Sequence, residues 1–154
     1  MHWSVVKFGK HCGKTLPEII FHDPGYFFWA IEAEVFRGAL KGEAKCIDER
    51  ARRIRVPSGV AGKPKVGYVY SRFDGRFSHL KLVPPDSLFD DGDSLLLRRD
   101  VIDLSLVFSV RPNFKVNGEA LIASFKSIIF ADAGYRMTRQ RCQAFFSRDE
   151  NFLI

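Results

Sequence analysis

The chain is organised around one segment near its N-terminus, Phe8-Gly9-Lys10-His11-Cys12-Gly13-Lys14-Thr15-Leu16-Pro17-Glu18. Two glycines bracket three residues there, and glycine supplies the positive φ of a tight turn without steric cost. Thr15 and Glu18 have the spacing of a capping box, and the first turn of a helix tolerates proline. The segment therefore predicts a turn that carries two lysines, followed directly by a short helix.

A second helix is predicted to start at Asp23-Pro24 and to extend over 26–36. Its residues are apolar on nearly every side, which is typical of a helix buried between neighbours. We therefore expect Phe28 and Trp29 to pack in the core.

A third helix is predicted over 43–55, because Ile47, Ala51 and Ile54 recur at helical spacing. Its remaining surface is strongly basic, and a basic helix face can contact phosphates. The candidates for such contacts are Arg50, Arg53 and Arg55. The alternative is a solvated helix face without a ligand.

Two β-rich runs over 65–83 are joined by Asp74-Gly75, the pair that a two-residue type I′ hairpin turn prefers. If Phe73 pairs with Arg76, alternation of side chains assigns every residue to a face. One predicted face consists of Tyr68, Tyr70, Arg72, Phe77, His79 and Lys81, and the predicted core face of Val69, Phe73, Leu80 and Leu82. Aromatic rings beside cations are what single-strand binders use to hold bases and phosphates. A helical layer over the mixed face, which would bury its tyrosines, remains the alternative.

The segment 84–100 is acidic and rich in turn residues, with a short strand predicted over 95–97. Apolar residues alternate over 102–110, which predicts a half-buried strand. Two helices follow, with Asn117 and Thr138 as their predicted caps. The fold class is therefore α+β: an N-terminal turn-and-helix module packed on a small antiparallel sheet, with C-terminal helices. Loop composition over 57–64 divides the chain into 1–56 and 65–154, and one continuous domain remains the alternative.

Composition restricts the class of protein. The 154 residues include 24 Lys and Arg against 18 Asp and Glu, a net charge of +6 that favours polyanionic partners. No apolar run approaches the roughly 18 residues that a membrane span requires, and the N-terminus lacks the layout of a secretion signal. Three scattered cysteines do not form a disulfide framework. We expect a cytoplasmic protein without a membrane partner.

The N-terminal residues resemble a known family. Phe8-Gly9-Lys10, Gly13-Lys14, Asp23-Pro24, Tyr26 and Trp29 match the small module at the C-terminus of exodeoxyribonuclease X and related stand-alone bacterial and phage modules. The resemblance covers only residues 3–36, and Cys12 stands where such modules often carry a basic residue. It implies a nucleic-acid-binding accessory role without nuclease activity, because the catalytic carboxylates of exodeoxyribonuclease X belong to a separate domain.

Nucleotide hydrolysis, zinc binding and triad catalysis find little support in the sequence. Gly13-Lys14-Thr15 is not part of a Walker loop, because the preceding glycine is one position too close. His11, Cys12, His22 and Cys46 lack the spacing of a zinc site. No catalytic triad is recognisable, and we expect no metal and no cofactor.

The sequence thus predicts a small cytoplasmic nucleic-acid-binding accessory protein of DNA metabolism, with DNA favoured over RNA. The predicted contacts lie in three places: Lys10, His11 and Lys14 of the turn, the arginines of the third helix, and the mixed hairpin face. Two alternatives stay open. One is a divalent-metal nuclease that uses Asp23, Glu43 or Asp103, and the other is a protein-interaction module of phage or mobile-element origin. A protein partner and the oligomeric state are left undetermined.

Overall fold

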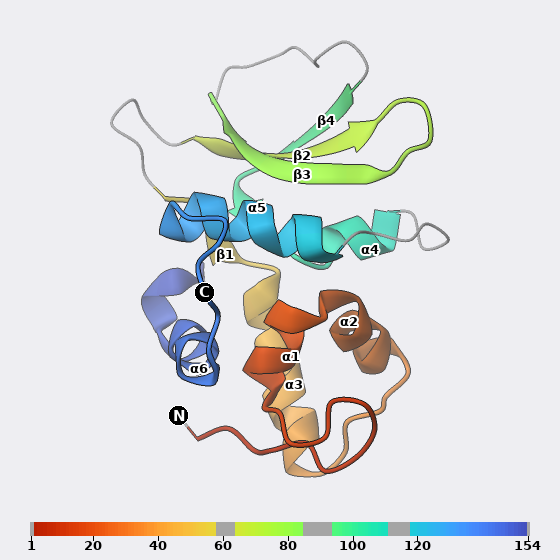
Figure 1. The fold of residues 1–154 in the computed structure, drawn as a ribbon, viewed down its shortest axis with the longest axis vertical. Helices are drawn as coiled ribbons and strands as arrows, with labels where there is room; N and C mark the ends of the chain where they lie inside the picture. The colour runs from red at the N-terminus through yellow and green to blue at the C-terminus, as the bar shows by residue number, and fades with distance from the viewer. Residues whose placement is uncertain (1, 58–63, 85–93, 111–117, 154) are drawn as a thin grey trace.

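A computed structural model describes residues 2–57, 64–84, 94–110 and 118–153. A three-stranded sheet occupies one end of the molecule and the N-terminal helices occupy the other (Figure 1). Helix α5, Gly118–Phe130, runs between them. Helices precede and follow the sheet along the chain, so the predicted α+β class is confirmed.

Two short helices follow the glycine turn: α1, Leu16–His22, and α2, Pro24–Glu32. The Glu18 carboxylate accepts hydrogen bonds from the backbone N–H of Thr15 at 3.0 Å and from its hydroxyl at 3.3 Å. Asp23 caps α2 by accepting from the backbone N–H of Tyr26 at 3.3 Å. These starts agree with the prediction. Helix α2 ends earlier than residue 36, because the chain turns away at Glu34, whose φ is 53°.

The third helix, α3, spans Ala39–Ala51 and so begins and ends earlier than the predicted 43–55. Gly38 precedes it with a φ of 63°, a conformation that lets the chain reverse into the helix. At the other end, β1, Ile54–Arg55, pairs antiparallel with β5, Val101–Ile102. Strand pairing with a distant segment therefore removes these two residues from the helix.

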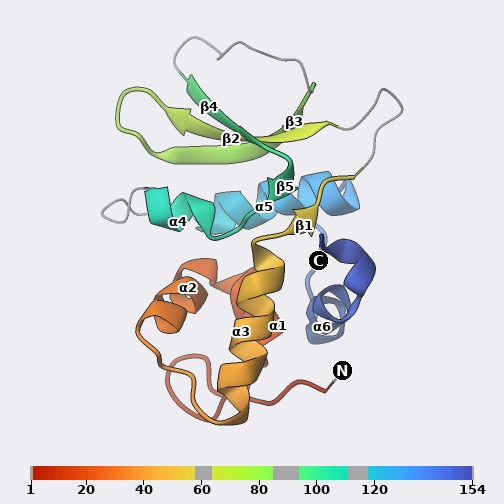
Figure 2. The same ribbon diagram turned by 180° about the vertical axis from the view of Figure 1, so that it is seen from behind.

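The sheet has β2, Lys65–Ser71, at its centre, between β3, Phe77–Val83, and β4, Ser94–Arg99. Strand β4 contains the predicted strand over 95–97. Helix α5 lies beside β3 in both views (Figures 1 and 2). The Ser124 hydroxyl oxygen accepts from the backbone N–H of Leu80 at 3.0 Å. The helix therefore covers part of an edge that would otherwise expose unpaired backbone groups.

The predicted two-residue turn at Asp74-Gly75 is wrong. The backbone N–H of Ser71 donates to the Arg76 carbonyl at 2.9 Å, so the loop contains 72–75. Gly75 has a φ of 70°, whereas Asp74 does not adopt the positive φ that a type I′ turn also needs. A four-residue loop thus replaces the tight turn, and the pairing of the two strands changes with it.

An irregularity between Val69 and Tyr70 changes the register again. Tyr70 pairs with Phe77 and Val69 with His79, so Ser78 is an extra residue on β3. Because a shift of one residue moves side chains to the other face of a sheet, the predicted mixed face does not exist.

The predicted strand over 102–110 is also wrong beyond Ile102. The chain forms helix α4, Leu106–Val110, instead. The Asp103 carboxylate accepts from the backbone N–H of Ser105 at 2.9 Å and from its hydroxyl at 2.6 Å. A carboxylate that bonds to the backbone two residues ahead competes with strand pairing and favours a turn.

The last helix, α6, Arg139–Ser147, forms as predicted, with the Thr138 hydroxyl accepting from the backbone N–H of Arg141 at 3.3 Å. Cys142, Phe145 and Phe146 of this helix are buried. A 3-10 helix, η1, Asp149–Asn151, follows. The predicted α5 cap, Asn117, lies outside the described residues, as do most of the 57–64 loop and of the acidic segment.

Phenylalanine rings join the two ends of the chain. The Phe21 ring of α1 lies 5.6 Å from that of Phe125, 5.5 Å from that of Phe145 and 5.4 Å from that of Phe146. The Phe152 ring stacks on Phe146 at 5.6 Å. The buried apolar residues form one cluster that includes members of both 1–56 and 65–154. The described parts of these two regions therefore share a hydrophobic core.

We predict that Tyr68→Phe lowers the free energy of unfolding by about 1–3 kcal/mol, measured by urea denaturation. The buried Tyr68 hydroxyl accepts from the backbone N–H of Asp103 at 2.6 Å, and its loss leaves that N–H without an acceptor. Tyr70→Phe is the matched control, because the Tyr70 hydroxyl is buried and has no hydrogen-bond partner within the described residues. It is expected to be neutral or stabilising. Equal losses from both substitutions would contradict this account.

Candidate nucleic-acid interface

The glycine turn is closed by backbone hydrogen bonds. The Val6 N–H donates to the Lys14 carbonyl at 2.9 Å, and the Gly13 N–H donates to the Val6 carbonyl at 2.8 Å. Gly9 and Gly13 have φ values of 69° and 91°, which residues with a Cβ rarely adopt. The turn is therefore held in one conformation, in which Lys10 is exposed and Lys14 is half-buried.

Asp23 connects the turn to α2. Its Oδ2 atom lies 3.0 Å from the Lys10 ammonium and 3.0 Å from Nε2 of the buried His11. Burial of the carboxyl raises the pKa of Asp23, but hydrogen bonds from Lys10, His11 and the Tyr26 N–H lower it by more, so that the pKa lies below 3.8. Two of the predicted nucleic-acid contacts are therefore already engaged within the protein. His11 has a structural role, and the Lys10 ammonium forms an ion pair with Asp23.

Aromatic side chains lie next to Lys10. Its ammonium is 5.1 Å from the centre of the Tyr26 ring, and the Tyr26 and Trp29 rings are 5.8 Å apart. Phe28 is buried as expected, but the prediction for Trp29 is wrong, because this side chain is 58% exposed. The exposure of Trp29 could not be predicted from the sequence, because a nearly all-apolar helix has no polar face that indicates which side contacts solvent. We call Lys10, Lys14, Tyr26 and Trp29 the turn surface.

On the other side of the turn, Arg139 of α6 connects the turn to α1. Its Nε donates to Glu18 at 2.7 Å and its Nη2 donates to the Gly13 carbonyl. The position of Arg139 beside the turn depends on the packing of α6 against α1. A second basic residue therefore lies close to Lys14, from a segment far away in the sequence.

The predicted arginine stripe is not a free surface. Arg50 is only 12% exposed, pairs with Asp149 at 2.6 Å and donates to the Phe146 carbonyl at 3.1 Å. Arg55 lies on β1 and donates to the Phe152 carbonyl at 3.0 Å. Both side chains thus hold the C-terminal segment on the N-terminal helices. Arg53 is exposed but lies beyond the end of α3.

The predicted hairpin face is divided between the two sides of the sheet. Tyr68, Tyr70 and Phe77 are buried, with exposed fractions of 0%, 8% and 7%. His79 and Lys81 lie on the opposite face, and Arg72 lies in the loop. The tyrosine rings therefore belong to the core, as the alternative to a stacking platform predicts.

The turn and the hairpin also lie at opposite ends of the molecule (Figure 1). Helix α5 separates the sheet from the N-terminal helices. The two groups of predicted contacts therefore do not form one surface.

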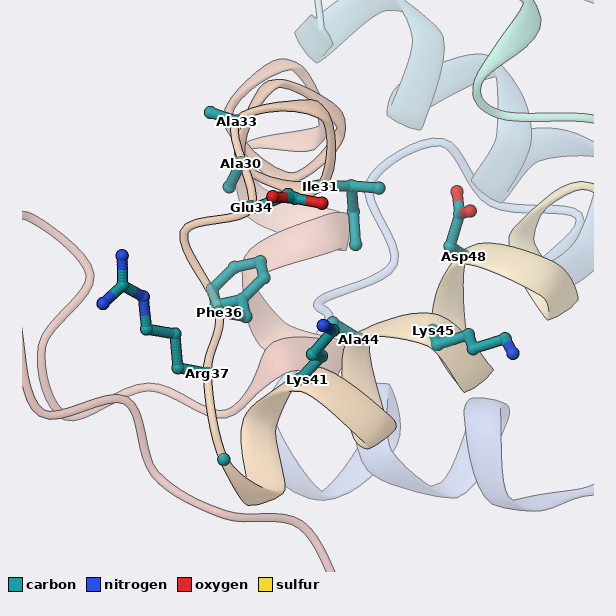
Figure 3. Close-up of a pocket in the computed structure, with 11 residues that line it drawn as sticks. Ala30, Ile31, Ala33, Glu34, Phe36, Arg37, Lys41, Ala44, Lys45 and Asp48 are labelled. Atoms are coloured by element: carbon teal, nitrogen blue, oxygen red, sulfur yellow. The ribbon is translucent and has the colours of Figure 1, made fainter.

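A groove of about 630 Å³ lies between α2 and α3. Ile31 and Phe36 point into it, and charged residues surround it (Figure 3). These charged residues are Glu34, Arg37, Lys41, Lys45 and Asp48. Charges of both signs line the groove, so its electrostatics do not select an anionic ligand.

The carboxylates of the nuclease alternative are engaged separately. Asp23 bonds to the turn, Glu43 accepts from the backbone N–H of Ser4 at 2.7 Å, and Asp103 accepts from the backbone N–H of Ser105 at 2.9 Å. In the described part of the chain, no group of three or more His, Cys, Asp or Glu side chains could hold a metal ion. The arrangement that a divalent-metal nuclease needs is thus not formed by these residues.

Comparisons with protein-family models, with curated protein sequences and with solved structures give no match to this chain. The resemblance of residues 3–36 to the exodeoxyribonuclease X module therefore stays a prediction. Within the ranges that the structure describes, no helix is both long and apolar enough to span a bilayer.

We predict that Asp23→Asn lowers the free energy of unfolding by about 1 kcal/mol at neutral pH, because the charge that binds Lys10 is lost while the cap of α2 is kept. The folded-state pKa of Asp23 is below the unfolded value, so its stabilisation is complete above that value and disappears as the pH falls through the folded pKa. The difference between wild type and variant should therefore shrink below pH 3.8.

The measurement is urea denaturation at neutral and acidic pH. Glu49→Gln, which removes an exposed carboxylate of α3, is the control and should change stability by less than about 0.5 kcal/mol. A difference for Asp23→Asn that is constant over the whole pH range would count against the proposed charge interaction.

Proposed function

We propose that this protein binds single-stranded nucleic acid through the turn surface, as a non-catalytic accessory of DNA metabolism. The observation that carries the proposal is the 58% exposed Trp29 ring beside Tyr26 and the Lys10 ammonium. Stacking of a base on an aromatic side chain contributes about 1–3 kcal/mol and is tolerant of sequence. Aromatic side chains have only two rotatable bonds, so they lose little conformational entropy when a strand binds.

The lysines of the glycine turn are the expected contacts with phosphates. Lys14 has no ion pair among the residues that the structure describes, and Arg139 lies next to it on the Gly13 carbonyl. Lys10 contributes less, because a phosphate would compete with Asp23 for its ammonium. Bases are thus expected on Trp29 and phosphates beside Lys14, because Arg139 is already paired with Glu18.

The net charge of +6 agrees with a polyanionic partner. DNA is favoured over RNA by the resemblance of residues 3–36 to a module of a deoxyribonuclease. The direct experiment is a fluorescence titration with single- and double-stranded oligonucleotides at two salt concentrations. Absence of binding, or binding that does not weaken with salt, would refute the proposal.

Trp29→Ala is expected to weaken binding to a labelled oligothymidylate by about 1–3 kcal/mol, or roughly 5- to 150-fold, because one stacking contact is lost. Fluorescence anisotropy measures this change. Phe73→Ala is the matched control, since Phe73 is an 84% exposed aromatic residue in the hairpin loop, at the other end of the molecule. Equal losses from the two substitutions would place the strand elsewhere.

Lys14→Met should reduce the slope of log affinity against log salt concentration by about 0.7, the value for one phosphate contact to a single strand. Affinity should fall for every oligonucleotide sequence, because a phosphate contact carries no sequence information. Lys81→Met, on the distant β3, is the control. An unchanged slope for Lys14→Met would show that Lys14 does not contact a phosphate.

A further inference from the structure

A pocket of about 480 Å³ lies between α1, α5 and the start of α6. It is lined by Glu18, Phe21 and His22 of α1, by Ile122 and Lys126 of α5, and by Arg136, Met137, Thr138 and Arg139. We call it the α1–α5 pocket. Its volume is in the range of sites that hold small ligands.

The charges around the α1–α5 pocket are mainly positive. Lys126 comes from α5, Arg136 and Arg139 come from the segment around the start of α6, and the one carboxylate, Glu18, is bonded to Arg139. In the described part of the chain neither Lys126 nor Arg136 makes an ion pair through its side chain. Two cations thus remain uncompensated at the pocket.

The buried thiol of Cys142 lies within the electrostatic influence of two of these charged groups. Burial and, to a lesser extent, the Glu18 carboxylate raise the pKa of the Cys142 thiol to about 12, and the Lys126 ammonium opposes this rise. Both charged groups therefore act on the same thiol from their two helices. The thiol itself stays protonated and takes no part in binding.

The floor of the α1–α5 pocket is apolar. Phe21, Ile122 and Met137 are buried, with exposed fractions of 2%, 6% and 6%. His22 is held at the rim by a contact of 2.9 Å between its Nε2 and the Met137 carbonyl. An apolar floor below a basic rim fits a ligand that joins a flat apolar body to a phosphate, as a nucleotide does.

We propose that the α1–α5 pocket receives the terminal phosphomonoester of a nucleic-acid strand whose following nucleotides lie on the turn surface. This inference rests on the proposed function. Arg139 connects the two places, because it lines the pocket and donates to the Gly13 carbonyl of the turn. A terminal phosphomonoester carries close to two negative charges at neutral pH, one more than an internal phosphodiester, so a basic pocket distinguishes a strand end from the middle of a strand.

The experiment compares one labelled oligothymidylate in three forms: with a 5′-phosphate, with a 3′-phosphate and with hydroxyls at both ends. Wild-type protein should bind one phosphorylated form roughly tenfold more tightly than the hydroxyl form. Lys126→Met should abolish this preference and leave the affinity for the hydroxyl form within about twofold of the wild-type value. Lys41→Met, in the groove between α2 and α3, is the control and should retain the preference.

Three outcomes would overturn the inference. Equal affinity for all three forms would leave the proposed function intact and refute the binding of a terminal phosphate in the α1–α5 pocket. A preference that survives Lys126→Met, in a variant with unchanged thermal unfolding, would place the phosphate elsewhere. Binding of thymidine monophosphate without binding of any oligonucleotide would refute both the inference and the proposed function.

Discussion

The buried carboxylate of Glu18 is the contact on which the N-terminal part of the structure depends. It accepts from Thr15 at the start of α1 and from Arg139 of α6, 2.7 Å away. A buried charge costs several kcal/mol unless it is paired and hydrogen-bonded, so this carboxylate requires both partners. The same arginine bonds to the Gly13 carbonyl, and the turn, α1 and α6 are thereby held in one arrangement.

Positive charge in this protein has two different uses. Arg50 and Arg55 bond to the C-terminal segment through Asp149 and the Phe146 and Phe152 carbonyls, and these side chains help to close the core. Lys14, Lys126 and Arg136 have no such partner in the described ranges. A net charge of +6 therefore says little about a binding surface until the arginines with structural roles are identified.

The aromatic residues divide in a similar way. The tyrosines of the hairpin belong to the core, where the Tyr68 hydroxyl supports the backbone at Asp103. Trp29 lies outside the core although its helix is nearly all apolar, because α2 contacts its neighbours mainly through Phe27, Phe28 and Ala30. The exposed Trp29 ring thus lies at the opposite end of the molecule from the hairpin tyrosines that alternation of side chains indicates.

The sequence by itself determined the features that depend on neighbouring residues. The turn between Gly9 and Gly13, the starts of α1 and α2, the α+β class and the α6 helix all follow from local caps, glycines and spacing. Backbone conformation and first-turn hydrogen bonds involve residues only a few positions apart, so a sequence pattern predicts them.

Only the tertiary structure decided the rest. The end of α3 depends on the pairing of Ile54 with Ile102, and the faces of the hairpin depend on a loop and a bulge that shift its register. The exposure of Trp29, the engagement of Arg50 and the position of Arg139 beside Gly13 depend on which helices pack together. In each of these features a contact with a residue distant in the sequence overrides the local preference. The sequence pattern indicates only the local preference.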